Sequence, residues 1–137
     1  MKEKLLGKNL DELKQIVANE GMPGFTAKQI AQWLYVKKVR TIDEMTNLSK
    51  AFREACEEKY VYTALEAALV QESKIDGTRK FLFRLADGNM VESVWMKYKH
   101  GNSVCISSQV GCRMGCRFCA STLDGLERNL LPSEMLD

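Results

Sequence analysis

Apolar residues near the start of the chain recur three and four positions apart. They follow Asn9, a favourable N-cap residue, and end before Gly21. Because residues at this spacing share one face of a helix, the pattern predicts an amphipathic helix between these two positions. The residues expected on its buried face are Leu10, Leu13, Ile16 and Val17.

Three further helices are predicted before residue 62. Thr26 and Gln29 have the spacing of a capping box. Thr41 and Glu44 repeat that spacing, and Ser49 is another favourable N-cap. Because apolar residues at helical spacing usually form a core, we expect a compact helical unit. Its expected core residues on these helices are Ile30, Trp33, Leu34, Phe52, Cys56 and Tyr60.

The period of the pattern changes from about 3.6 to 2 after residue 62. Alternating apolar and polar positions, separated by Asp-Gly pairs, predict β-strands joined by tight turns. The expected strands cover residues 64–73, 78–85, 90–96 and 104–109, with Asp-Gly turns at residues 76–77 and 87–88. Residues 132–137 have the pattern of a helix N-cap and first turn.

Glu92 is placed on a strand face with apolar neighbours. Side chains alternate along a strand, so it shares a side with Met90, Val94 and Met96. Two interpretations stay open. Glu92 is either a solvated or ion-paired surface acid, or a partly desolvated base of the kind that abstracts protons.

Composition places the chain among ordinary globular proteins. Of its 137 residues, 45% are hydrophobic and 28% charged, which excludes disorder and collagen-like repeats. The net charge of +2 neither requires nor forbids a nucleic-acid partner. No apolar run reaches the ~20 residues of a membrane span, and the first residues lack a signal-peptide pattern. We therefore expect a cytoplasmic protein without membrane contact.

Three of the five cysteines lie close together. Cys112, Cys116 and Cys119 have the spacing C-x3-C-x2-C, which is too tight for the disulfide framework of a secreted protein. Three thiolates from one loop can hold three irons of a cubane iron–sulfur cluster and leave the fourth open to another ligand. Gly111 and Gly115 would let the backbone pass close to such a cluster. The spacing favours an iron–sulfur site.

Two other interpretations of these cysteines remain open: a zinc knuckle completed by His100 or Cys105, and a group of reduced thiols without metal. Structural zinc sites usually combine two knuckles, and no C-x2-C or H-x3-H partner follows Cys119. A zinc site would make the chain a non-catalytic, zinc-stabilised RNA-binding module. The basic residues that would then meet phosphates are Lys37, Lys38, Arg40, Lys97 and Lys99.

The cysteine motif, with Phe118 before its third cysteine, resembles the signature of radical S-adenosylmethionine (radical SAM) enzymes. The string Cys105-Ile-Ser-Ser-Gln-Val-Gly-Cys112 and the later Arg128-Asn129-Leu130 are similar to a narrower group, the RlmN-type adenine C2 RNA methyltransferases and their antibiotic-resistance relatives. Residues 25–33, 43–50 and 76–85 resemble the helical accessory domain and β segment of the same family. The resemblance covers nearly the whole chain.

This resemblance implies roles for individual residues. Cys112, Cys116 and Cys119 would ligate a [4Fe-4S] cluster whose open iron binds S-adenosylmethionine. In the family, a methyl group carried on a cysteine is activated by a 5′-deoxyadenosyl radical and added to C2 of adenine. Glu92 matches the family's proton acceptor, and Cys105 matches the cysteine that forms a transient disulfide with the methyl-carrying cysteine. The implied partners are 23S ribosomal RNA, transfer RNA and a cellular one-electron reductant, and we expect a monomer.

The expected fold class is α+β to α/β. We expect a helical accessory domain for RNA recognition or scaffolding at residues 1–62, a β-hairpin segment carrying Glu92 at residues 63–100, and the start of a radical SAM partial β/α barrel at residues 101–137. Several β/α units of about 30 residues each do not fit after Cys119. We therefore expect an N-terminal fragment that lacks the methyl-carrying cysteine and is inactive alone. Within the enzyme class, a different radical SAM reaction stays the alternative.

Overall fold

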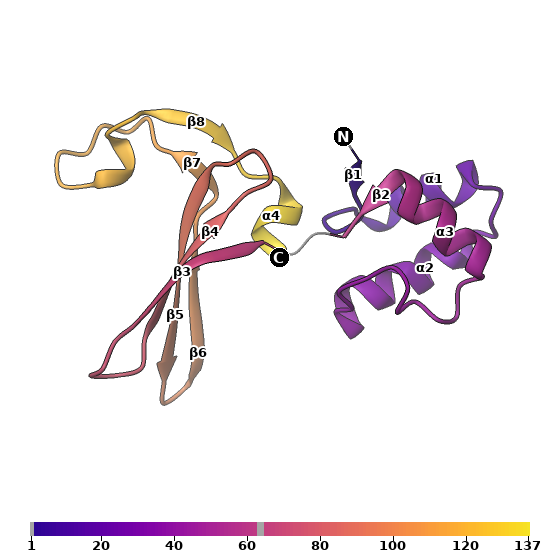
Figure 1. Cartoon of the computed structure of the whole chain (residues 1–137), viewed down its shortest axis with the longest axis horizontal. Helices are drawn as coiled ribbons and strands as arrows, with labels where there is room; N and C mark the ends of the chain where they lie inside the picture. Colours follow the sequence, from indigo (N-terminus) through magenta and orange to yellow (C-terminus); the bar gives the residue numbers. More distant parts are fainter. Residues whose placement is uncertain (1, 63–64) are drawn as a thin grey trace. The chain divides into compact units, whose positions relative to one another are not determined.

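The computed structural model describes residues 2–62 and 65–137, which divide into two compact units between residues 62 and 65. Residues 2–62, the helical unit, contain the helices α1 to α3, and residues 65–135, the sheet unit, contain β3 to β8 (Figure 1). No helix in the described part of the chain is long and apolar enough to cross a membrane.

The helical unit is built from four helical segments and one short strand pair. The helices are α1 (Leu10–Asn19), α2 (Phe25–Ala31), the π-helical turn η1 (Gln32–Lys37) and α3 (Lys50–Lys59). Strand β1 (Glu3–Lys4) pairs in parallel with β2 (Tyr60–Val61), which joins the two ends of the unit. This pair is too short to leave a pattern in the sequence.

Two helix starts are confirmed in detail. The Asn9 side chain accepts hydrogen bonds from the backbone N–H groups of Asp11 and Glu12 at 3.0 and 2.9 Å. The Glu12 carboxylate in turn accepts from the Asn9 N–H at 2.7 Å, which completes a capping box. At α3, Ser49 Oγ accepts from the Phe52 N–H at 3.3 Å. These bonds satisfy N–H groups that a helix start leaves unpaired.

The predicted start of the second helix is wrong. Helix α2 begins at Phe25, with Gly24 in the N-cap position and no side-chain cap. The Thr26 side chain is buried, and its backbone N–H donates to the Pro23 carbonyl. Packing in the core therefore takes Thr26 away from the capping role. Leu10, expected on the buried face of α1, is 38% exposed because it lies at the first turn of that helix.

The predicted helix after Thr41 is also wrong, although the Glu44 half of the expected capping box forms. The Glu44 carboxylate accepts from the N–H groups of Arg40 and Thr41 and from the Thr41 hydroxyl. The following backbone bonds join residues three apart, Met45 to Ile42 and Leu48 to Met45. The segment is thus a series of turns, which places its apolar side chains in the core without a continuous helix.

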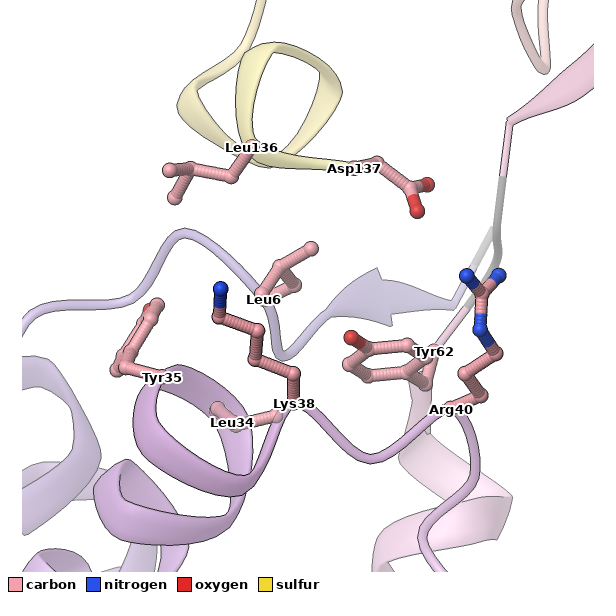
Figure 2. A pocket seen from close by; sticks show the side chains of 8 residues that line it. All are labelled: Leu6, Leu34, Tyr35, Lys38, Arg40, Tyr62, Leu136 and Asp137. Atoms are coloured by element: carbon pink, nitrogen blue, oxygen red, sulfur yellow. The ribbon is translucent and has the colours of Figure 1, made fainter. Parts of the chain in front are cut away.

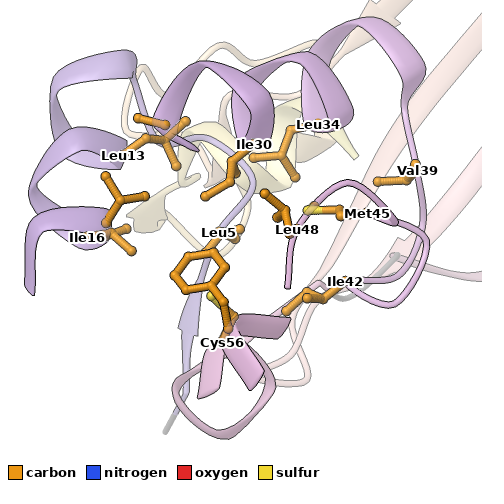
Figure 3. Close-up of a cluster of buried hydrophobic side chains, with 13 residues drawn as sticks. Leu5, Leu13, Ile16, Ile30, Leu34, Val39, Ile42, Met45, Leu48 and Cys56 are labelled. Carbon is orange, nitrogen blue, oxygen red and sulfur yellow. The ribbon is translucent and has the colours of Figure 1, made fainter. Parts of the chain in front are cut away.

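Helices and turns of the helical unit enclose one hydrophobic core (Figure 3). Leu13 and Ile30 come from α1 and α2, and Phe52 and Cys56 from α3. Burial raises the pKa of the Cys56 thiol to about 11, so this cysteine stays protonated and serves as a core residue, as expected. Trp33 packs at the edge of the core and is only partly buried.

The sheet unit holds a four-stranded antiparallel sheet of order β3-β4-β5-β6. Its strands are β3 (Glu66–Glu72), β4 (Arg79–Arg84), β5 (Met90–Tyr98) and β6 (Gly101–Ile106). A second pair, β7 (Gln109–Gly111) with β8 (Leu126–Asn129), flanks a short 3-10 turn, η2 (Ala120–Thr122), and helix α4 (Pro132–Leu136) follows. The Asp-Gly hairpins are confirmed. The expected strand residue 64 lies outside the described residues.

The strand predicted at residues 104–109 is divided in two. It breaks at residues 107–108, so that β6 pairs with β5 and β7 pairs with β8. The expected domain boundary at residues 100 and 101 falls inside the β5–β6 hairpin. Within the sheet unit, the described strand pairs are all antiparallel, and the barrel start stays an expectation.

Candidate functional site

The cysteine loop, residues 112–125, is fastened at both ends. Strands β7 and β8 pair beneath it, and the Cys112 N–H donates to the Gly125 carbonyl at 2.8 Å. The Gln109 side-chain amide donates to Asn129 Oδ1 at 2.7 Å, and the Leu130 N–H donates to the Ser108 carbonyl at 2.9 Å. The strings that carry the family resemblance therefore bond to each other at the base of the loop.

Gly111 is required by the backbone of this base. Its φ is +74°, and a Cβ atom added there would lie 2.0 Å from the Gly125 carbonyl oxygen. No L-residue fits that contact without moving the loop. Gly115 also has a positive φ, +69°, but a Cβ atom there would meet nothing within 4 Å. The close contact that requires glycine at position 111 is therefore with the Gly125 carbonyl of the same chain.

The three loop cysteines are half-buried, and all five cysteines of the chain are free thiols. The Cys119 N–H donates to the Cys116 carbonyl at 3.1 Å, and the Thr122 hydroxyl donates to the Cys119 carbonyl at 3.2 Å. Among the described residues, no three cysteine, histidine or acidic side chains are grouped as a metal site. The loop fixes the backbone around the thiols and leaves Phe118 94% exposed.

Glu92 and Cys105 lie on one face of the sheet, on adjacent strands. Cys105 pairs with Val94, and Glu92 lies two residues from Val94 on the same side. Cys105 is exposed, and the Glu92 carboxylate forms an ion pair with Lys80 at 2.7 Å. The Glu92 side chain is 57% exposed. Geometry thus matches the surface-acid interpretation and also leaves the carboxylate accessible to a substrate.

Two serine hydroxyls tie the strands that carry these residues. Ser93 Oγ donates to the Cys105 carbonyl at 2.9 Å, and Ser107 Oγ donates to the Glu92 carbonyl at 2.8 Å. The second bond lies where β6 ends and the chain turns toward β7. Both serines fix the main chain at the two candidate residues. Sequence reasoning missed them because a serine in a strand gives no signal of its partner.

Arg128 is the second feature that the sequence did not reveal. Its guanidinium bonds both Glu134 carboxylate oxygens, at 2.8 and 2.9 Å, and Asp87 Oδ2 at 2.7 Å. The Glu134 side chain is only 4% exposed. Hydrogen bonding to Arg128 holds the pKa of Asp87 at about 2, well below its usual range. This network joins the β4–β5 turn, β8 and α4.

The basic residues of the zinc alternative lie in two separate places. Lys37 Nζ lies 3.5 Å from the centroid of the Trp33 ring, and Lys38 has a left-handed backbone at the end of η1. Lys38 and Arg40 lie in the helical unit, where Figure 2 shows their side chains with those of Tyr35 and Tyr62. The other basic residues, Lys97 and Lys99, lie near the β5–β6 turn.

His100 lies at that same turn, stacked on Tyr98 with ring centroids 5.2 Å apart. The six residues of β6 separate it from the end of the strand that leads to the cysteine loop. At ~3.3 Å per residue this is a span of about 20 Å. His100 is therefore not positioned as a fourth ligand beside the cysteines.

Comparison with known proteins gives consistent results. Residues 3–61 match the family model of the ribosomal RNA large subunit methyltransferase N-terminal domain. The chain is 61% identical over 129 residues to a probable dual-specificity RNA methyltransferase RlmN of Lachnospira eligens, covering 94% of this chain and 37% of that protein. It is 51% identical over 135 residues to the corresponding protein of Staphylococcus epidermidis, covering 98% and 37%.

A solved structure agrees with these relatives. The crystal structure of a radical SAM methyltransferase from Sphaerobacter thermophilus superposes with a TM-score of 0.86 at 38% identity, covering 97% of this chain and 39% of that one. The chain thus spans little more than a third of the proteins it matches. Residues 3–61 thus match the ribosomal RNA large subunit methyltransferase N-terminal domain, and the chain as a whole is similar to part of the RlmN-type RNA methyltransferases.

Proposed function

We propose that this chain is part of a radical SAM enzyme that methylates C2 of an adenosine in 23S ribosomal RNA and in transfer RNA, through a methyl-cysteine intermediate. The observation that carries the proposal is the C-x3-C-x2-C loop fastened by β7 and β8. Its base is formed by the residues that resemble the RlmN-type family, and the relatives of the chain are named RNA methyltransferases.

The donor set of the cysteine loop fits an iron–sulfur cluster. It offers three thiols in eight residues, and His100 lies at the far end of β6 from the loop. Cys112, Cys116 and Cys119 would hold a [4Fe-4S] cluster, which supplies the one-electron reduction of S-adenosylmethionine when it is bound. The chain's own contribution is to fix the loop backbone at Gly111 and Gly125. Arg113 and Arg117, both exposed, add positive charge beside the thiolates.

Glu92 and Cys105 would complete the reaction on the RNA adduct. The Glu92 carboxylate would accept the proton from C2 of adenine. The Cys105 thiolate would attack the sulfur of the methyl-carrying cysteine, so that a disulfide forms as the sulfur–carbon bond breaks; the carbon would keep the electron pair and take up a proton to become the methyl group. Glu92 and Cys105 lie on the same face of the sheet, so both groups are presented to one side. This placement supports a role for Glu92 as proton acceptor and for Cys105 in disulfide formation on the same substrate.

The experiment uses Glu92→Gln and Cys105→Ala in the complete enzyme with its RNA substrate. Covalent protein–RNA species are measured on denaturing gels, and 5′-deoxyadenosine is measured alongside. Glu92→Gln should form an adduct that resolves slowly, and Cys105→Ala should trap it firmly. Both variants should keep 5′-deoxyadenosine release, because neither residue is a cluster ligand in this scheme.

Matched controls lie in the same sheet. Glu66→Gln removes an exposed, ion-paired acid of β3, and Ser103→Ala removes a polar side chain of β6 on the face of Cys105. Both should turn over normally. Normal turnover of Cys105→Ala or Glu92→Gln would remove that residue from the mechanism. A wild-type enzyme that leaves no 2-methyladenosine in digested RNA would refute the proposed function itself.

A further inference from the structure

The β3–β4 and β5–β6 hairpins turn at the same end of the sheet. Arg79 pairs with Glu72 in β3 and with Trp95 in β5, so the turn at residues 73–78 and the turn at residues 99–100 both lie beyond this row. The two turns, here called the hairpin tips, project away from β7, β8 and α4 within the sheet unit (Figure 1). Ile75 at the first tip is 98% exposed.

Positive charge on the sheet is distributed unevenly. The strand residues Arg79, Lys80 and Arg84 each form an ion pair with a carboxylate. Within the described residues, no ion pair forms at Lys74, Lys97 or Lys99, which are exposed at and beside the tips. Two acids lie nearby: Glu72 pairs with Arg79, and Asp76 accepts a hydrogen bond from the Thr78 N–H as part of the turn. The tips thus present three lysines with no acid partner.

A flat aromatic surface lies among these lysines. Tyr98 and His100 stack with an interplanar angle of 8°, and Tyr98 is 49% exposed. The Tyr98 hydroxyl donates to Met96 Sδ at 3.4 Å, at the edge of the ring and outside the stacked faces. Ammonium groups beside an exposed aromatic plane match the phosphates and bases of a nucleic acid, which lysines and aromatic rings bind together.

We propose that the hairpin tips bind RNA, with Lys74, Lys97 and Lys99 on phosphates and the Tyr98–His100 stack against a base. This inference rests on the proposed function for the identity of the nucleic acid. From Glu92 to Tyr98 the strand runs six residues, or about 20 Å. The tips therefore hold a part of a folded RNA distant from the adenosine that reacts, and they add binding energy from outside the reaction centre.

The test measures RNA binding by the complete enzyme across a range of salt concentrations. Two probes are used, a folded transfer RNA and a short single-stranded oligonucleotide that contains the target adenosine. For transfer RNA, the combined variant K74Q/K97Q/K99Q should weaken binding about tenfold or more and lower the salt slope by about 2 to 3, since each lost phosphate contact removes ~0.7 to 0.9. Binding of the oligonucleotide should not change, because it is too short to reach the tips.

The aromatic stack is tested separately. Tyr98→Ala should weaken transfer RNA binding at least about fivefold, and Tyr98→Phe should restore it, since stacking needs only the ring. K14Q/K50Q/K59Q serves as the charge control, because it removes three partly or fully exposed, ion-paired lysines of the helical unit. It should leave the salt slope unchanged.

Unchanged transfer RNA affinity and salt slope in the tip variants would overturn this inference, as would an equal loss in the charge control. The proposed function is judged by a different readout, 2-methyladenosine in the RNA. An enzyme that methylates RNA but binds it without the tips would contradict only the tip proposal. An enzyme that makes no 2-methyladenosine would contradict the proposed function, while the binding series still reports on the tips.

Discussion

Two glycines of the cysteine loop share a positive φ but differ in their surroundings. Gly111→Ala should lower the free energy of unfolding more than Gly115→Ala, because only the first places a Cβ atom against the Gly125 carbonyl. Backbone strain alone costs about 1 to 2 kcal/mol at either position. Chemical denaturation of both variants measures the difference. Equal losses would mean that the contact at Gly111 relaxes freely and does not fix the base of the loop.

Trp33 is a residue whose burial the helical pattern overstates. It lies at the core edge, its indole N–H donates to Asn47 Oδ1 at 2.5 Å, and Lys37 covers its ring. Trp33→Ala should therefore destabilise by about 2 to 3 kcal/mol, below the roughly 3 to 5 of a fully buried aromatic. Trp33→Phe should cost only about 1 kcal/mol, for the lost hydrogen bond. Thermal and denaturant unfolding give both values, and a neutral Trp33→Ala would make the ring a surface residue.

At the scale of elements, Arg128 is the main link between the β4–β5 turn and α4. Arg128→Ala should destabilise by about 3 kcal/mol, because it removes the guanidinium that pairs with the buried Glu134 carboxylate. Arg84→Ala is the matched control, since its pair with Glu66 is exposed and spans 3.6 Å, and such pairs contribute less than about 1 kcal/mol. Similar losses in urea unfolding would show that the Arg128 network adds little.

Asp87 gives this network a pH dependence. Its folded pKa of about 2 lies below the ordinary value near 4. Its stabilising contribution is therefore complete above about pH 4 and declines as the pH falls toward 2. Between pH 6 and pH 2, the free energy of unfolding should fall less steeply in Asp87→Asn than in the wild type. Identical pH profiles in both proteins would mean that Asp87 does not contribute to the stability of the sheet unit.

The sequence predicts helix starts and hairpin turns well where their hydrogen bonds join residues close together in the chain. The Asn9 and Ser49 caps and the Asp-Gly hairpins follow from hydrogen bonds within three or four residues. Thr41 with Glu44 shows the limit, because the same side-chain bonds serve a turn and a helix start alike. The division of the strand at residues 107–108 depends on distant partners in β5 and β8, which spacing along the chain does not encode.

The candidate site shows the same limit. The C-x3-C-x2-C spacing identifies the loop, and strand alternation places Glu92 correctly beside Val94. The partners of the site come from elsewhere in the chain: Lys80 for Glu92, Gly125 for Gly111 and Asp87 for Arg128. Each pair forms only when separate strands meet, so a single sequence read in order does not reveal them.

The two units of the whole molecule differ in the size of their cores. The helical unit buries residues from every helix, whereas the sheet unit buries Leu85, Val91 and Leu130. Because buried apolar area is the main source of stability, we expect two unfolding transitions, with the sheet unit melting first. Tryptophan fluorescence separates them through Trp33→Phe and Trp95→Phe variants, each reporting on one unit. One transition shared by both reporters would show that the units unfold together.

The cysteine loop provides the most direct test of the whole account. After anaerobic reconstitution, the protein should hold about four iron and four sulfide per chain. Serine at any one of Cys112, Cys116 or Cys119 should abolish this uptake, while Cys105→Ser and Cys56→Ala should retain it, because Cys105 lies on β6 and Cys56 is buried in the helical core. Stoichiometric zinc without iron, or equal iron loss in Cys56→Ala, would contradict the assignment.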